Sequence, residues 1–201
     1  TPNNNNKPTW QSFDEWAAKQ ADLSQLRFIL QGENYVCRWI TLPGVQGRHL
    51  PKALPFALEE SLIEDIRSYH IVTTGKHGKF NHRVYCNQSD PLKRLLEACE
   101  HRNITLRQLI PETSLIPENT LTRNGDYWLI NIPGLTEAKI HESALLGFLD
   151  GICNNQTEGS LESLKLIDTS LDSGNLLKTQ IESSFSGVFQ SIHVQIGTFS
   201  E

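Results

Sequence analysis

Short blocks of apolar residues follow one another along the first part of the chain, which is typical of a mixed α and β domain. Residues 26–31 and 35–42 carry the apolar and aromatic side chains that favour strands. Gly32, Glu33 and Asn34 between them are residue types that form tight turns. We therefore predict a β-hairpin in which the two strands are neighbours.

A helical period comes next. From position 54 onward an apolar residue recurs every four residues, which predicts an amphipathic helix from Pro51 or Pro55 to Ser68. Its apolar stripe consists of Leu54, Leu58, Leu62, Ile66 and Tyr69. If the helix begins at Pro51, Pro55 removes an internal hydrogen bond and should kink it. Asp65 falls on the stripe, so its carboxylate must be paired, hydrogen-bonded or at a mobile helix end.

The opposite face of this predicted helix is charged and carries Glu60, Glu64 and Arg67. Together with Glu59 and Asp65, the two glutamates form a concentrated acidic stretch. Such a stretch is either a solvated helix face, a docking surface for a basic partner, or a catalytic carboxylate cluster. The catalytic interpretation would need a histidine or a metal close in space. The sequence leaves these three alternatives open.

Residues 69–110 have the order strand, strand, helix, strand. We predict strands at 69–74, 80–86 and 104–110, and a helix that opens at Asp90. The inner face of that helix is predicted to carry Leu92, Leu95, Leu96 and Cys99. This order predicts a compact α+β subdomain, supported by the preceding helix.

The turn between the first two of these strands is basic, with Lys76, Lys79 and Arg83 beside His77 and His82. A basic turn can meet anionic lipid headgroups or an acidic partner. It can equally be a solvated hairpin end.

After Pro117 the pattern begins again. Strands are predicted at residues 127–132, 164–167 and 188–196. Residues 141–152 have the apolar spacing of a helix, and residues 168–174, rich in serine and aspartate, are predicted as a loop.

Length and charge narrow the classes of function. A chain of 201 residues forms one large domain or two small ones. It has 18 basic and 23 acidic residues and a net charge of -5, which excludes a body-wide basic surface, so we predict no nucleic-acid partner. It also has no run of about 18 apolar residues that would span a membrane.

Methionine is absent even at position 1, so we expect a fragment of a longer protein.

Motifs of the common enzyme classes are missing. The sequence has no P-loop, no dinucleotide-binding glycine motif, no nucleophile elbow, no HExxH and no EF-hand loop. The nearest approach to a metal site consists of His77, His82, Cys86 and Cys99. Their spacing matches no closed zinc site, and the four cysteines form no CxxC pair. We therefore predict buried thiols, no metal, no cofactor and no catalytic residue.

One stretch resembles a known family. It reads Leu54-Pro55-Phe56-Ala57-Leu58-Glu59-Glu60, followed by Leu62, Glu64-Asp65 and Tyr69-His70. This series is similar to the cytoplasmic domain of the L protein of the bacterial type II secretion system. In that family an acidic helix with leucine, proline and an aromatic residue runs into an aspartate and a strand with an aromatic–histidine element.

The flanking motifs resemble the family in the same order, so the resemblance covers about residues 10–199. They are Ile40-Thr41-Leu42-Pro43-Gly44, Asp90 to Cys99, Leu109-Ile110-Pro111-Glu112, Ile116-Pro117, Asn124-Gly125-Asp126-Tyr127-Trp128-Leu129-Ile130 and Ile196-Gly197-Thr198-Phe199.

The resemblance implies an α+β fold of actin-like, RNase H-related subdomains with a small inserted α+β subdomain. Residues 1–50 would be part of the first RNase H-like subdomain, with its N-terminal strands missing. Residues 51–112 would form the small subdomain with the acidic helix. Residues 113–201 would form the second RNase H-like subdomain and end before the linker to a transmembrane helix.

The family's role is also implied by the resemblance. Its members are non-enzymatic, single-pass proteins whose domain lies at the cytoplasmic face of the bacterial inner membrane. That domain recruits and anchors the secretion ATPase, the E protein, and contacts the F protein, which supports pseudopilus assembly and protein export. The M protein associates through the membrane and periplasmic parts. Self-association in the family allows a homodimer.

The alternative is an actin-like ATPase or nucleotide-sensing module, which would use the carboxylates of Asp126 or Asp168. Bulky residues from Tyr127 to Ile130 stand where phosphate-binding loops need glycines, so we interpret the nucleotide site as lost. An RNase H-like nuclease would need clustered carboxylates and a basic track, and the sequence offers neither.

Our prediction for the partner-binding residues is Glu59, Glu60, Glu64 and Arg67. An exposed strand edge within residues 69–110 is the next candidate. The basic turn with Lys76, Lys79 and Arg83 is a weaker candidate for anionic lipid or for a partner.

Overall fold

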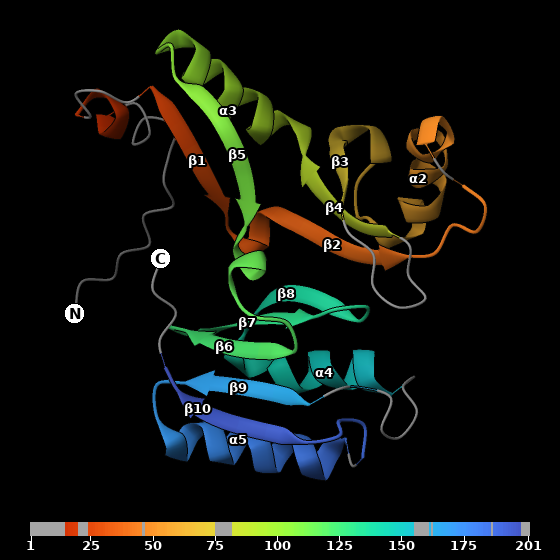
Figure 1. Ribbon diagram of the computed structural model, residues 1–201, viewed down its shortest axis with the longest axis vertical. Coiled ribbons are helices and arrows are strands. Elements are labelled where there is room, and N and C mark those ends of the chain that lie inside the picture. Colours follow the sequence, from red (N-terminus) through yellow and green to blue (C-terminus); the bar gives the residue numbers. More distant parts are fainter. Residues whose placement is uncertain are drawn as a thin grey trace.

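The computed structural model describes residues 15–19, 24–45, 47–74, 82–154, 161, 163–185 and 187–197. Figure 1 shows two halves stacked along the long axis of the molecule. We call residues 24–111 the upper half, which holds two small sheets, and residues 112–197 the lower half, which holds one larger sheet. The chain passes from one half to the other between Pro111 and Glu112.

Five strands and a series of short helices build the upper half, and residues 15–18, before it, are also helical. The strands are β1 (Gln25–Leu30), β2 (Tyr35–Ile40), β3 (Tyr69–Thr74), β4 (His82–Gln88) and β5 (Thr105–Pro111). The α-helices are α2 (Leu50–Leu58) and α3 (Ser89–His101). The 3₁₀ helices are η1 (Gly32–Asn34), η2 (Gly47–His49), η3 (Glu59–Ser61) and η4 (Ile66–Ser68).

The predicted hairpin of β1 and β2 is wrong, although both strands exist. β1 pairs in parallel with β5, whereas β2 pairs antiparallel with β4 in a three-stranded sheet of order β2-β4-β3. The residues between them form η1, which carries the chain from one sheet to the other. The predicted pairing of β3 with β4 is confirmed.

The predicted helix to Ser68 is too long, because α2 ends at Leu58. Pro55 lies inside α2 and has no N–H for the helix ladder. The Ser61 hydroxyl donates to the carbonyl oxygen of Leu58 at 2.8 Å, which replaces a continuing helical hydrogen bond. The backbone is extended at Leu62 before η4 begins, so the acidic stretch is a bent segment rather than a helix face.

The two sheets of the upper half are built from strands on both sides of residue 50. β1 pairs with β5 and β2 with β4, so both sheets join strands from residues 1–50 to strands from residues 51–112. The division into subdomains at residues 50 and 112 stays a prediction.

The lower half is a five-stranded sheet of order β10-β9-β6-β7-β8 with two α-helices. The strands are β6 (Thr120–Asn124), β7 (Tyr127–Ile132), β8 (Thr136–His141), β9 (Leu164–Asp168) and β10 (Ile192–Ile196). The helices are η5 (Glu112–Leu115), η6 (Glu142–Ala144), α4 (Leu145–Cys153) and α5 (Leu171–Ser184). β6, β7 and β8 form an antiparallel meander, and β9 and β10 run parallel to β6.

Local chemistry explains two features of this half. Gly125 turns the chain between β6 and β7 with a φ of 61°, a region that glycine enters without strain. The loop predicted at 168–174 is wrong, because α5 begins at Leu171. The hydroxyl of Ser170 caps α5 by accepting from the backbone N–H of Ser173 at 3.2 Å.

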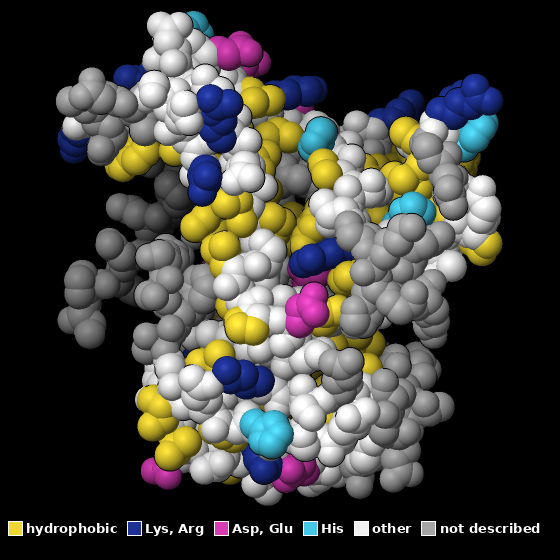
Figure 2. Space-filling model, in the orientation of Figure 1, with side chains coloured by type: hydrophobic (Ala, Val, Ile, Leu, Met, Phe, Trp, Pro, Cys, Tyr) yellow, Lys and Arg dark blue, Asp and Glu magenta, His cyan; other side chains and the backbone are white. Residues whose placement is uncertain are grey.

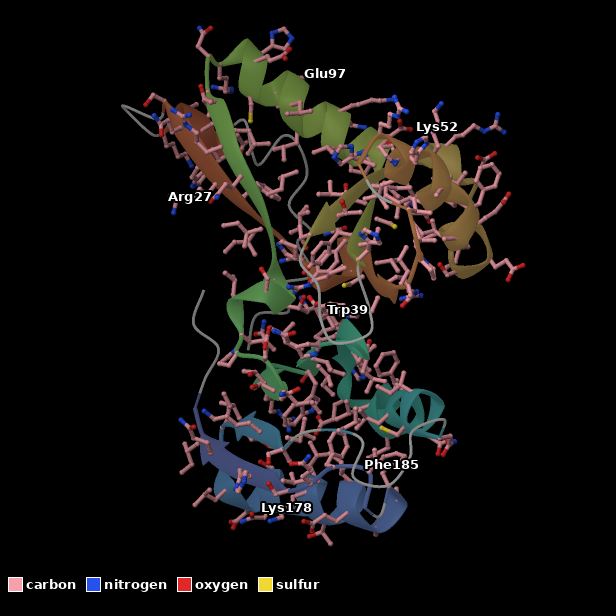
Figure 3. All side chains as sticks on the ribbon, turned by 45° about the vertical axis from the view of Figure 1, so that its right-hand side comes forward. Arg27, Trp39, Lys52, Glu97, Lys178 and Phe185 are labelled. Carbon is pink, nitrogen blue, oxygen red and sulfur yellow. The ribbon has the colours of Figure 1, made fainter. Side chains whose placement is uncertain are left out.

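Apolar packing differs between the halves. In the lower half α4 and α5 pack on one face of the sheet around fifteen buried residues, with Phe185 among them (Figure 3). The upper half has two separate clusters, one of four buried residues around Leu95, which includes Ala17 of the preceding helical residues, and one of four around Leu58. Leu96, predicted to face inward, is 42% exposed. No apolar cluster of the described residues contains members of both halves.

Candidate functional site

The acidic segment, residues 59–67, follows α2 and comprises η3, the extended backbone at Leu62 and the first residues of η4. The side chains of Glu59, Glu60 and Glu64 are exposed, as the docking prediction requires. Glu64 accepts hydrogen bonds from Gln88 Nε2 at 2.9 Å and from Ser68 Oγ at 3.3 Å. Within the described part of the chain, Glu59 and Glu60 have no ion pair, so their charges are available to a partner.

Arg67 and Asp65 are bound to each other. The Arg67 guanidinium donates to both Asp65 oxygens, with Nη2 2.7 Å from Oδ2, and the Arg67 backbone N–H donates to Oδ1 at 2.9 Å. The pair is largely exposed. Hydrogen bonds from Arg67 lower the pKa of Asp65 to about 2. The carboxylate that the helical pattern placed on an apolar stripe is therefore exposed and paired.

Two large apolar side chains stand out of the same region. Phe56, on α2, is 80% exposed, and Ile63, within the acidic segment, is fully exposed. Their apolar surface is therefore available to a partner. The exposure of Ile63 was not predicted from the sequence, because the predicted helix continued through this residue.

Of the three residues of the predicted basic patch, the structure describes one. Lys76 and Lys79 lie outside the described residues. Arg83, on β4, points toward the lower half, and its side chain is only 20% exposed. Its guanidinium lies 5.5 Å from the centre of the Trp39 ring and 5.1 Å from that of Tyr85, and it forms an ion pair with Glu137. Arg83 is therefore committed to an internal contact.

Glu137, on β8, is the centre of a polar cluster where the two halves meet. Its carboxylate is buried and accepts hydrogen bonds from Arg83 Nη2, Tyr85 Oη at 2.8 Å and Thr113 Oγ1 at 3.1 Å. The thiol of Cys37 donates to its other oxygen at 3.5 Å. Three donors come from the upper half and one from η5.

Tyr35 extends this cluster through Thr113. The two hydroxyl oxygens are 2.7 Å apart, and the Thr113 backbone N–H donates to the Tyr35 oxygen at 3.1 Å. Because Thr113 gives its single hydroxyl proton to Glu137, Tyr35 must donate to Thr113. Burial raises the pKa of Tyr35 to about 12 and also raises the pKa of Cys37, with the nearby Glu137 charge adding to both shifts.

A second group of polar contacts joins the halves beside the first. The buried Glu112 accepts from the backbone N–H of Gly32 at 2.9 Å, and Lys139 Nζ lies 3.4 Å from Glu112 and 3.2 Å from Glu33. Burial alone would lower the pKa of Lys139, but the charges of Glu112 and Glu33 outweigh it and raise the pKa. A Cβ at Gly32 would overlap the Cβ of Lys139, so only glycine allows this approach.

We define the junction as both groups of contacts taken together. Its members are Gly32, Glu33, Tyr35, Cys37, Arg83, Tyr85, Glu112, Thr113, Glu137 and Lys139. Figure 2 shows basic and acidic side chains next to each other at this level, and Figure 3 shows Trp39 there.

The two aspartates of the nucleotide hypothesis have different surroundings. Asp126 is exposed in the turn between β6 and β7. Asp168, at the end of β9, is buried and accepts from the Thr169 backbone N–H at 2.6 Å. Its other oxygen is 3.8 Å from Arg123 Nη1. That guanidinium also donates to Glu142 at 2.7 Å and lies against Trp128.

Metal-binding groups do not gather in the described part of the chain, where no three His, Cys, Asp or Glu side chains come together as a metal ion requires. Cys86 and Cys99, two members of the weak metal set, are buried in different apolar clusters. His77 lies outside the described residues. Within these limits, no described helix is long and apolar enough to cross a bilayer.

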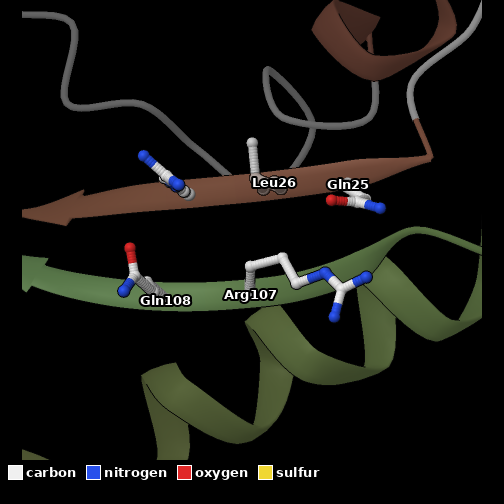
Figure 4. A pocket seen from close by; sticks show the side chains of 5 residues that line it. Gln25, Leu26, Arg107 and Gln108 are labelled. Carbon is white, nitrogen blue, oxygen red and sulfur yellow. The ribbon is translucent and has the colours of Figure 1, made fainter.

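Two hollows border β1. An apolar groove of about 900 Å³ runs along β1, β2 and the start of α3, with Ile63 and Tyr69 among its lining residues. A polar pocket of about 600 Å³ lies on the other side of the β1–β5 pair (Figure 4). Its lining includes Arg27 and Arg107, which have no ion pair within the described ranges.

Comparison with known proteins identifies the family. The family model of type II secretion system protein L matches residues 6–169, which is most of the chain. The chain belongs to the type II secretion system protein L family. Two curated members of this name match about half of it. The protein of Pectobacterium carotovorum subsp. carotovorum is 26% identical over 98 residues, and that of Dickeya chrysanthemi is 28% identical over 91 residues.

These matches cover 47% and 45% of this chain but only 23% of each relative, so the aligned part spans about a quarter of the protein L relatives' length.

Solved structures share the fold. The cytoplasmic domain of EpsL, an inner membrane component of the type II secretion system of Vibrio cholerae, matches with a TM-score of 0.62 and 16% identity. That match covers 95% of this chain and 71% of the other. The PilM-PilN type IV pilus biogenesis complex matches with a TM-score of 0.50 and 11% identity over 92% of this chain and 76% of the other. The predicted α+β, actin-like fold is confirmed for this member of the protein L family.

Proposed function

We propose that this chain is the cytoplasmic part of an inner-membrane platform protein that recruits and anchors the secretion ATPase, the E protein. The observation that carries the proposal is the acidic segment of a protein L family member. There Glu59 and Glu60 have no ion pair in the described part of the chain and Ile63 is exposed, as is Phe56 on the preceding helix α2. Apolar anchors surrounded by charges suit a partner surface that is basic at its rim and apolar at its centre.

The wider role follows the family. The domain would lie at the cytoplasmic face of the bacterial inner membrane and contact the F protein. The M protein would associate through parts of the protein beyond this chain. Together these contacts would support pseudopilus assembly and protein export. A homodimer stays a prediction.

An adaptor without enzymatic activity fits the chemistry of the described residues. Asp168 has the Arg123 guanidinium beside it, and at the junction side chains of the two halves bond to one another. Neither arrangement offers the clustered carboxylates or open backbone N–H groups that phosphate chemistry uses.

The test is light scattering after gel filtration of this chain mixed with the N-terminal domain of its cognate secretion ATPase, without nucleotide. We expect a stable complex. The double variant Glu60→Lys/Glu64→Lys should weaken it at least about tenfold, because two attractive charges become repulsive. Glu97→Lys/Glu100→Lys, on the exposed face of α3, makes the same change of charge and should bind like wild type. Equal loss in both variants, or in neither, would remove the acidic segment from the proposal.

The alternative function is an actin-like ATPase or nucleotide sensor, and the fold shared with the PilM-containing complex favours it. It requires measurable affinity for ATP with Mg²⁺ and a loss of that affinity when Asp126 or Asp168 is changed to asparagine. Calorimetric titration of the chain with ATP and Mg²⁺ decides between the two functions. Binding that depends on either aspartate would replace the adaptor proposal.

A further inference from the structure

The two halves are held together by polar contacts. None of the three apolar clusters of the described residues spans both halves. Hydrogen bonds across the boundary instead join Cys37, Arg83 and Tyr85 of the three-stranded sheet to Glu137 of the five-stranded sheet. An apolar interface loses stability gradually as area is lost, whereas a buried charge that loses its partner is strongly destabilising.

The topology allows the halves to separate without unfolding. In the described part of the chain, the only covalent passage between them is at Pro111 and Glu112. Among the described strands, none of the upper half is hydrogen-bonded into the sheet of the lower half. Rotation about this passage would break the junction and would leave every described sheet intact.

We propose that the junction is a latch: it opens as one unit and swings the three-stranded sheet away from the five-stranded sheet while the three apolar cores stay folded. Glu137 is the central element, because four side chains from three different segments donate to one carboxylate. The Gly32–Glu112 and Lys139 contacts reinforce it. The latch sets the position of the acidic segment relative to the lower half. An open state would change that position without any change in the segment itself.

The chain contains its own reporters. Cys37 is buried in the junction, whereas Cys86, Cys99 and Cys153 are each buried in one of the three apolar clusters. Opening of the latch exposes Cys37 alone, and unfolding of a core exposes one of the others. Labelling with iodoacetamide under native conditions, followed by mass spectrometry of each cysteine, therefore separates latch opening from unfolding.

We expect Glu137→Gln to speed Cys37 labelling about 10- to 100-fold, because Arg83 loses its buried partner. The other three cysteines should keep their wild-type rates. Glu142→Gln, which breaks the exposed Arg123–Glu142 pair within the lower half, is the matched control and should leave Cys37 unchanged.

A second variant distinguishes opening of the latch from a direct effect of Glu137 on the reactivity of the Cys37 thiol. Glu137 raises the pKa of Cys37 and Arg83 lowers it, so Glu137→Gln and Arg83→Met would change thiol reactivity in opposite directions if nothing opened. Both variants speed Cys37 labelling if the latch opens. Thr113→Val, which removes one hydrogen bond to Glu137, serves as a milder variant should the charge variants fail to fold. The latch proposal would be overturned if the two charge variants changed the Cys37 labelling rate in opposite directions or left it unchanged. Equal acceleration of labelling at all four cysteines would also overturn it.

Discussion

The lower and upper halves of this molecule differ in how their sheets and apolar cores are arranged. The lower half has one continuous sheet, two helices on one face and a single apolar core of fifteen buried residues. The upper half divides a similar length of chain between two small sheets, each with a cluster of four buried residues. The buried polar side chains Glu112, Thr113 and Glu137 lie between the halves and bond across the boundary. The lower half therefore supplies most of the hydrophobic stabilisation, whereas the junction determines how the upper half is oriented.

This difference matters for the proposed adaptor. The exposed acidic segment belongs to the half with the smaller cores, so its placement depends on polar contacts with the larger one. Buried polar networks stabilise one geometry strongly when every member is satisfied and weakly when one member is lost.

The sharpest test of the comparison removes a leucine from each half. Leu166 is fully buried in the lower core, so Leu166→Ala should lower the free energy of unfolding by about 2–5 kcal/mol. Leu95→Ala in the upper half should fall at the lower end of that range, because its partly exposed neighbours can close around the cavity. Urea unfolding followed by circular dichroism measures both. An equal or larger loss in Leu95→Ala would contradict the contrast between the cores.

The next largest effect should come from Gly32→Ala at the junction. The added methyl group would overlap the Cβ of Lys139, so η1 must move away from β8 at a cost of about 1–3 kcal/mol. Gly147→Ala on α4, which meets no neighbouring atom, is the control and should not destabilise. If both variants melt at the wild-type temperature, the close approach of the halves is not required.

Several elements could be predicted from the sequence, because their side chains alternate or recur regularly. This holds for β1, β2, β3, β7 and α4. The pairing of β1 with β5 could not, since it joins residues about 80 positions apart, and a local turn between β1 and β2 looked sufficient. α5 was missed because its first turn is polar and its buried positions, such as Leu177 and Ile181, come only later.

The acidic segment could be located from its charges alone, but its bent shape and the exposure of Ile63 could not. The junction was not predictable. β8 contains Glu137 and Lys139, whose charges conceal the apolar alternation of a strand. The partners of Glu137 lie 24 to 100 positions away, and no local pattern connects them.

Alkaline pH should weaken the junction more than the cores. Tyr35 keeps its proton in the folded state up to a pKa of about 12, whereas an unfolded tyrosine loses it near 10. A raised folded pKa contributes stability that is complete below pH 10 and is lost as the pH rises from 10 to 12. A tyrosinate absorbance titration should show Tyr35 ionising late, and Thr113→Val should change its midpoint. Ionisation of Tyr35 at the ordinary pKa would show that the junction is open.

The smallest effect should come from the exposed Asp65–Arg67 pair in the upper half. Because the pKa of Asp65 is lowered to about 2 from an ordinary value of 3.8, the pair stabilises above pH 3.8 and loses its effect as the pH falls toward 2. Solvent screens an exposed pair, so Asp65→Asn should leave the melting temperature at pH 7 almost unchanged. A large loss at pH 7 would mean that surface charges hold the upper half as strongly as the junction does.

Hydrogen–deuterium exchange of this chain tests the central claim most directly. The exchange is measured for the chain alone, for the chain with the N-terminal domain of the cognate secretion ATPase, and for the chain with ATP and Mg²⁺. The adaptor account predicts that the ATPase domain slows exchange in residues 56–67 and that ATP changes nothing. Protection by ATP around Asp126 or residues 168–174, with no protection of residues 56–67 by the ATPase domain, would contradict it.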